Sequence, residues 1–147
     1  MKSLKVGIAL LAALFMVSAC ATADTAPAPK PVAKAKKVPG PFNVYFALNS
    51  TELDDAAFAT VANAYDKLRW AKLSGATVQA HADSSGSNLA NAKISAARMD
   101  TVVNLLKEFG LAADKISKAA YGENKPAVKT ADGVKEAKNR RVVITLK

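Results

Sequence analysis

The sequence contains few of the residues that most often carry catalysis or bind metals. Its 147 residues include one cysteine, Cys20, and one histidine, His81. A single cysteine excludes an internal disulfide and a two-cysteine metal site. A single histidine excludes a zinc motif built on a histidine pair. These absences direct the search for function toward binding rather than toward catalysis.

One long apolar run stands near the start, at residues 6–17, after the basic segment 1–5. Small residues follow it at Ser18 and Ala19. A basic segment, an apolar segment and small residues in this order are typical of a secretory signal peptide. The alternative is a membrane-spanning helix, which needs about 20 apolar residues. Because the run ends sooner, we expect residues 1–19 to be a signal peptide.

The junction Val17-Ser18-Ala19-Cys20 resembles a bacterial lipobox. The resemblance implies cleavage before Cys20 and its acylation, for instance by palmitate. Several acyl chains would anchor the protein stably. The alternative is an ordinary signal peptide followed by an unmodified cysteine. Ala21 in the next position implies, by the sorting rule for such lipoproteins, a lipid-anchored protein of the cell outer membrane with its domain in the periplasm.

Residues 20–41 are expected to form a lipidated tether. Five of the six prolines of the chain lie there among alanines and lysines. Such a composition cannot bury a core, and an extended proline-rich stretch of this length spans roughly 60 Å. The tether therefore either carries the domain away from the lipid or serves as a spacer of no required length. Its lysines either contact anionic headgroups or keep it solvated.

The net charge is +9, and without Lys2 and Lys5 it is about +7. A basic balance favours polyanionic surroundings, namely nucleic acid, anionic lipid or a carboxylate-rich polymer, and charge alone does not choose among them. Export disfavours nucleic acid as a partner.

Residues 42–147 are expected to form one mixed α/β (α+β) domain. Strands alternate with helices, and two strands then follow with only a loop between them, which is typical of a layered fold with a sheet of about four strands and two main helices. The expected order is β-α-β-α-β-β, with strands at 42–48, 76–82, 115–121 and 141–146 and helices at 54–73 and 88–109.

The apolar spacing predicts which face of each helix is buried. Asp54 is a plausible N-cap of the first helix, and Trp70 is expected to be a partly exposed packing residue. The predicted stripe of the first helix is Phe58, Val61, Tyr65 and Leu68. That of the second is Ile94, Ala97, Val102, Leu105, Leu106 and Phe109.

A group of polar residues begins where the second strand ends. Asp83 is followed by Gly86, Asn91 and Arg98 at offsets of three, eight and fifteen residues. Ligands of open α/β sheets commonly lie at strand ends, and a helical arginine leans back toward the start of its helix. The alternatives are that Asp83 is only a turn residue or helix cap and that Arg98 is solvated. His81 is expected to be a structural, hydrogen-bonding histidine.

The stretch His81-Ala82-Asp83-Ser84-Ser85-Gly86, with Asn91, Arg98 and the closing Asn139-Arg140-Arg141-Val142, resembles the OmpA-like peptidoglycan-binding family. The resemblance covers residues 42–147, and segment 121–128 looks most like its branch of peptidoglycan-associated lipoproteins. It implies binding of the zwitterionic end of diaminopimelate in the wall peptide, without cofactor or metal. By this resemblance Asp83 holds the ammonium, Arg98 takes the carboxylate through its planar fork, and Asn91 and Asn139 shape the pocket.

The sequence departs from the family pattern at several positions. Segment 46–49 lacks the usual acidic residue, Ala80 replaces a glycine, Ala90 an aromatic residue and Ala97 a basic one. The two principal contacts remain, so these departures are expected to alter the rim of the pocket.

Three function classes follow. The first is an outer-membrane lipoprotein that binds peptidoglycan non-covalently and tethers the membrane to the wall. The second is a docking subunit of an envelope complex, with partners such as the Tol system implied by the branch resemblance. The third, an enzyme, is disfavoured because Cys20 is expected to be acylated and distant from His81, although two carboxylates of a glycosidase remain conceivable. We therefore expect a binding protein without catalytic activity.

Overall fold

The computed structural model describes residues 38–147. The predicted signal peptide, the predicted lipidation site Cys20 and most of the predicted tether lie outside these residues. Within 38–147, no helix combines the length and the apolar character that a membrane crossing needs.

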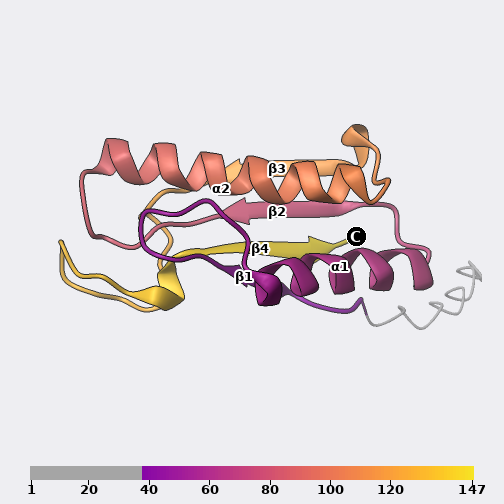
Figure 1. Ribbon diagram of the computed structural model, residues 1–147, viewed down its shortest axis with the longest axis horizontal. Coiled ribbons are helices and arrows are strands. Elements are labelled where there is room, and N and C mark those ends of the chain that lie inside the picture. The colour runs from indigo at the N-terminus through magenta and orange to yellow at the C-terminus, as the bar shows by residue number, and fades with distance from the viewer. Residues whose placement is uncertain (1–37) are drawn as a thin grey trace, which may run out of the picture. The chain divides into compact units, whose positions relative to one another are not determined.

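The described chain forms four strands and two long helices (Figure 1). In order these are β1 (Phe42–Tyr45), α1 (Asp55–Trp70), β2 (Ala76–Ala80), α2 (Asn88–Glu108), β3 (Ile116–Ala120) and β4 (Arg141–Leu146), with single 3-10 turns at Ala113–Lys115 and Ala137–Asn139. The mixed α/β fold class, the element order and the strand count predicted from the sequence are confirmed.

The sheet has the order β1-β4-β2-β3. β4 is antiparallel to both of its neighbours, with Ile144 opposite Phe42 of β1 and Val78 of β2. β2 and β3 are parallel, and α2 makes the crossover between them, as a parallel pair requires. The last strand of the chain therefore lies inside the sheet rather than at its edge.

Both helices lie on one face of this sheet. α1 packs on β1 and β4, α2 packs on β2 and β3, and the two helices touch each other. Alternate residues of β2 and β4 are fully buried, as expected when only one face of an antiparallel sheet is covered. The core between the layers includes the fully buried side chains Val44, Val61, Val78, Val102 and Ile144.

The predictions for the buried face of α1 are wrong at Phe58 and at Trp70. α1 buries Ala57, Val61, Ala64 and Leu68, whereas Phe58 is 48% exposed. Small alanines bring α1 close to the sheet, and Phe58 lies at the margin, where its ring meets Phe109 of α2 at 5.7 Å. Trp70 is also not a packing residue, because 81% of its surface is exposed.

The predicted stripe of α2 is correct only in its second half. Val102, Leu105 and Leu106 are buried, but Ala97 is exposed and Ile94 only half-buried. The buried residues of the first half are polar: Asn91, Ser95 and Arg98. This half of the helix lies beside the polar residues that follow β2, so its buried face is polar rather than apolar.

The elements run lengthwise, which gives the domain two distinct ends (Figure 1). The loop end, at the left, holds the end of β2, the start of α2 and the segments 81–87 and 121–140. The Trp70 end, at the right, holds the ends of α1, α2 and β4 and the starts of β2 and β3. Paired backbone hydrogen bonds between Gly75 and Lys147 close the Trp70 end.

Candidate functional site

Asp83 is buried just beyond the end of β2, with 4% of its surface exposed. The backbone leads to it in extended form, since the His81 N–H donates to the carbonyl of Arg141 and that of Ala82 to the carbonyl of Gly122. The cap of α2 is Ser87, whose hydroxyl accepts from the Ala90 N–H. The interpretation of Asp83 as a helix cap is therefore wrong.

Three donors surround the Asp83 carboxylate. The Ser85 hydroxyl donates to Oδ1 at 2.7 Å, while Arg140 Nη1 at 2.9 Å and the Glu136 N–H at 3.2 Å donate to Oδ2. Burial raises the pKa of Asp83, but the hydrogen bonds from Ser85, Arg140 and Glu136 outweigh it and lower the pKa below its ordinary value. Asp83 is therefore an anion at neutral pH.

Arg98 is even more deeply buried, with 1% of its surface exposed, so the interpretation of a solvated arginine is wrong. Its Nε donates to the Ser50 carbonyl at 2.9 Å and its Nη2 to the Ala47 carbonyl at 3.0 Å, both in the loop after β1. The guanidinium carbon lies 5.3 Å from the centre of the Phe46 ring. Nη1 is also buried and has no hydrogen-bond partner, so one nitrogen of the fork is unsatisfied.

The structure brings Asp83, Arg98 and Arg140 within electrostatic range of one another. Burial lowers the pKa of Arg98 to about 10, repulsion from Arg140 lowers it further, and attraction to Asp83 opposes both. Arg98 therefore remains protonated at neutral pH. One carboxylate interacts with two guanidiniums, which gives the site a buried anion and an excess of one positive charge.

Asn91 lies on the first turn of α2, on the same helical face as Arg98, and is 4% exposed. Its amide nitrogen donates a short hydrogen bond to the Glu123 carboxylate in the loop after β3. The bond joins the start of α2 to that loop. The predicted pocket residue is thus placed beside a carboxylate that the sequence interpretation had not assigned.

Asn139 is 1% exposed and its amide is occupied by backbone groups. Its oxygen accepts from the N–H groups of Ala127 and Val128, and its nitrogen donates to the Val128 carbonyl at 2.8 Å. Asn139 therefore fixes the 126–128 segment and shapes the site indirectly.

A groove of about 480 Å³ lies between the loop after β1, the loop after β2 and the first three turns of α2. Gly86 has φ +119°, a conformation that favours glycine. Asn49, Ala90 and Ala97, where the sequence departs from the family pattern, all line this groove, together with Ser85, Gly86 and Asn91. Three of the departures therefore fall at the groove, whereas Ala80, at the end of β2, is fully buried in the core.

A second cavity, of about 270 Å³, is lined by Ser84, Glu123, Asn139 and the segment 124–132. It adjoins the groove because Ser84 precedes Ser85 and because Glu123 is bonded to Asn91. Within residues 38–147, no three histidine, cysteine, aspartate or glutamate side chains gather as metal ligands would.

His81 is a buried structural histidine, as the sequence suggested. It is 4% exposed, its Nδ1 has no partner, and its ring stacks on Tyr121 at 5.5 Å. Burial, and then the charge of Arg141, lowers its pKa to about 4, although a hydrogen bond with the backbone of Lys125 acts to raise the pKa. His81 is therefore a neutral packing residue at neutral pH.

Sequence reasoning assigned no role to Ser85, Glu123 or Arg140, each of which bonds a predicted site residue. The available signal for Arg140 was its place in the motif Asn139-Arg140-Arg141-Val142. The next residue, Arg141, begins β4 and its Nη1 is buried without a partner. The side chains of Arg140 and Arg141 thus have different surroundings, although the two residues are adjacent, and the sequence alone does not reveal which of them contacts Asp83.

The fold is a two-layer α/β domain with a groove at its loop end, and the groove residues Ser85 and Ala97 adjoin the buried charged group of Asp83, Arg98 and Arg140. Residues 45–140 match the model of the OmpA family, and the chain belongs to this family.

Two curated relatives are outer-membrane proteins. The chain is 29% identical to outer membrane porin F of Pseudomonas aeruginosa, over 68% of this chain and 29% of the porin. It is 35% identical to outer membrane protein P5 of Haemophilus influenzae, over 65% of this chain and 28% of that protein. The chain thus spans less than a third of the length of either relative.

Among solved structures, the peptidoglycan-associated lipoprotein of Burkholderia pseudomallei superposes with a TM-score of 0.64 at 22% identity, covering 71% of this chain and 89% of that one. This likeness establishes the fold.

Proposed function

We propose that this protein binds peptidoglycan non-covalently and recognises the free zwitterionic end of diaminopimelate in the wall peptide. Asp83 would receive the ammonium and Arg98 the carboxylate. The groove beside them, lined by Asn49, Ser85 and Asn91, would hold the rest of the residue.

The observation that carries this proposal is the buried Nη1 of Arg98, which has no hydrogen-bond partner. The other two donating groups of this guanidinium are held by the carbonyls of Ala47 and Ser50, so its orientation is fixed before any ligand arrives. A buried cation with one unused donor is costly unless something accepts from it. A ligand carboxylate would accept that hydrogen bond and compensate the excess positive charge, while the ammonium of the same zwitterion would lie against the Asp83 carboxylate.

The test is retention of the purified protein on insoluble wall that contains diaminopimelate. We expect Asp83→Asn and Arg98→Lys each to weaken retention at least tenfold, since each removes a charge-assisted contact or its fork. Matched controls on α1 and α2, Arg69→Lys and Asp100→Asn, change exposed residues of the same types and should bind as wild type.

Circular dichroism must show that the variants remain folded. If both site variants, correctly folded, bind the wall like the controls, the site assignment fails. Wall with lysine in place of diaminopimelate should retain the protein poorly, because lysine lacks the terminal carboxylate that Arg98 would bind.

The lipoprotein part of the proposal concerns Cys20. Acylation there would fix the protein to the outer membrane, and the domain would grip the wall from the periplasm and tether the two layers. The lipobox supports this, as do relatives named as outer-membrane proteins. Radiolabelled palmitate should enter the protein, and Cys20→Ala should abolish that incorporation and release the protein from outer-membrane fractions.

We further propose that the protein catalyses no reaction. The buried, neutral His81 packs on Tyr121 rather than facing a nucleophile, which supports a purely binding role. Incubating purified protein with wall and separating the soluble muropeptides is the check. New fragments that vanish with the Asp83→Asn variant would contradict the proposal.

Docking to an envelope protein, as in a Tol-type complex, is the second candidate. The exposed side chains of Val128 and Val134, in the segment next to the second cavity, favour it as a surface for a protein partner. Crosslinking in intact cells followed by wall digestion distinguishes the two functions. Discrete protein adducts that survive digestion would support docking.

A further inference from the structure

The Trp70 end carries the most exposed large hydrophobic side chain of the described domain. Trp70 is 81% exposed at the last position of α1. It is also the only tryptophan of the chain. The indole combines a large apolar body with one polar group, and such a side chain is enriched at interfaces and at the boundary between water and lipid.

Basic residues surround Trp70 at this end. Exposed residues there are Lys67, Arg69, Lys72, Lys107, Lys115 and Lys147, against the acidic residues Asp66, Glu108 and Asp114. The end therefore has a net charge of +3, while the rest of residues 38–147 holds nine basic and eight acidic side chains. The positive charge of the domain is concentrated beside the exposed indole, at the end opposite Asp83.

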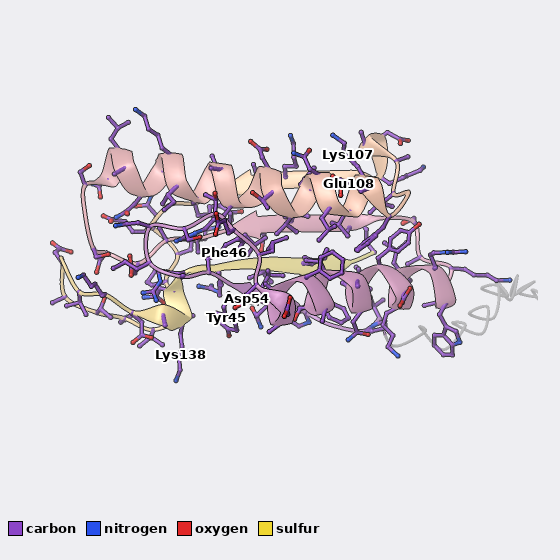
Figure 2. All side chains as sticks on the ribbon, in the orientation of Figure 1. Tyr45, Phe46, Asp54, Lys107, Glu108 and Lys138 are labelled. Atoms are coloured by element: carbon purple, nitrogen blue, oxygen red, sulfur yellow. The ribbon has the colours of Figure 1, made fainter. Side chains whose placement is uncertain are left out.

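Contacts tie these residues into one surface. Lys147 pairs with Gly75, and a Cβ on Gly75 would meet the Lys115 carbonyl, so the starts of β2 and β3 and the end of β4 adjoin. Tyr65 joins α1 to the end of α2 through Phe109, and Arg69 lies over the Tyr65 ring. Figure 2 shows Lys107 and Glu108 at this end of α2, away from Lys138 at the loop end.

The chain also enters the domain at this end. β1 begins at Phe42, which lies opposite Ile144, and β4 runs from there toward Lys147. The segment that connects the domain to its predicted lipid anchor therefore starts on the same side as Trp70. If Cys20 is lipidated as proposed, the anchor would hold the domain near the membrane at a high effective concentration.

From these observations we infer that the Trp70 end is a docking surface for an anionic phospholipid bilayer, with the indole at the headgroup level and the surrounding lysines over anionic headgroups. The inference uses neither Asp83 nor Arg98 and stands whether or not the protein binds the wall. Because the two surfaces are at opposite ends, membrane docking leaves the groove facing away from the lipid.

The experiment uses the full chain reconstituted into vesicles, with the emission of its single tryptophan, Trp70, as the readout. In vesicles containing phosphatidylglycerol we expect a blue-shifted emission and strong quenching by lipids brominated near the headgroup. In phosphatidylcholine vesicles we expect emission close to that of an exposed indole. Replacing Lys67, Lys72 and Lys115 with glutamine should weaken docking about fivefold for each lysine removed.

A matched reporter tests the geometry. Leu89, 67% exposed at the start of α2, lies at the loop end, and the double variant Trp70→Phe/Leu89→Trp moves the fluorophore there. This reporter should not be quenched. Equal quenching of both reporters, equal Trp70 spectra in the two lipids, or a blue shift that follows protein concentration without vesicles would each overturn the inference. Loss of wall binding, measured separately with Asp83→Asn, leaves these spectra unchanged.

Discussion

The Asp83 carboxylate meets two guanidiniums, whereas the sequence had indicated one. Arg140 donates to Oδ2 directly, and Arg98 acts from a greater distance. An incoming ammonium would therefore bind through Oδ1, beside the Ser85 hydroxyl, because Oδ2 already accepts from Arg140 and Glu136. Arg140 lies under the site as a counter-ion, and its contribution is to hold Asp83 ionised and in place.

Removing this counter-ion should destabilise the fold. Arg140 and Asp83 have side chains only 13% and 5% exposed, and breaking a buried ion pair costs about 3 kcal/mol. We expect Arg140→Gln to lower the free energy of unfolding in urea at pH 7 by about that amount. Lys138→Gln, an exposed neighbour, is the control. The double variant Arg140→Gln/Asp83→Asn should lose less than the sum of the single losses, and strict additivity would contradict direct coupling.

His81 should make stability depend on mildly acidic pH. Its pKa falls from 6.5 to about 4 in the folded state, so between these pH values the unfolded chain binds a proton that the folded chain does not. Stability is therefore full above pH 6.5 and declines as pH falls toward 4, by about 3 kcal/mol in all. His81→Phe, which keeps an aromatic ring on Tyr121, should lack this component. Parallel stability profiles of the two proteins from pH 6.5 to 5 would exclude the effect.

At the scale of elements, α2 serves two purposes along its length. Its second half supplies apolar core residues, and its first half buries Asn91, Ser95 and Arg98 at helical spacing. The hydroxyl of Ser95, which is fully buried, donates to the Ala92 carbonyl and accepts from the Gly122 N–H at 3.2 Å. This contact holds the loop after β3 against the helix, which places Glu123 next to Asn91.

Ser95→Ala tests this contact between elements. The change leaves the buried Gly122 N–H without its acceptor, so we expect a loss of about 1–2 kcal/mol in the free energy of unfolding. Amide hydrogen exchange at Gly122 should also become faster. Thr101→Ala, which removes a hydroxyl from the outer face of the same helix, should change neither quantity. Unaltered exchange at Gly122 in the Ser95 variant would refute the assignment.

The sequence predicted the elements well because their patterns are local. Asp54 caps α1 as expected, with its carboxylate accepting from the Ala57 N–H at 2.7 Å, and β2 alternates as predicted. Asp83 and Arg98 were predicted to converge, and both are buried near one another. The burial of Asn91 and Ser95 was not predicted, because polar residues at helical spacing look the same as a solvated face. That Asp83 and Arg98 contact a ligand stays a prediction.

At the scale of the molecule, Gly75 joins three strands at the Trp70 end. It is paired with Lys147, and an added Cβ would lie 2.2 Å from the Lys115 carbonyl oxygen, which belongs to the backbone. We expect Gly75→Ala to force these strands apart and to cost about 2–3 kcal/mol in thermal unfolding. Gly133→Ala is the comparison, since at φ +79° with no atom within 4 Å it incurs only backbone strain of about 1 kcal/mol. Similar melting temperatures for the two variants would contradict the clash.

The position of β4 inside the sheet has a consequence for biosynthesis. β1, the first strand, pairs with residues 141–146, and β2 pairs with the same strand on its other edge. While the ribosome is still adding the residues before Arg141, β1 has no neighbour to pair with, and such distant pairings form slowly. The native sheet therefore cannot be completed before residues 141–146 are made, and a chain with an incomplete sheet resists threading through a narrow channel less than a finished domain does.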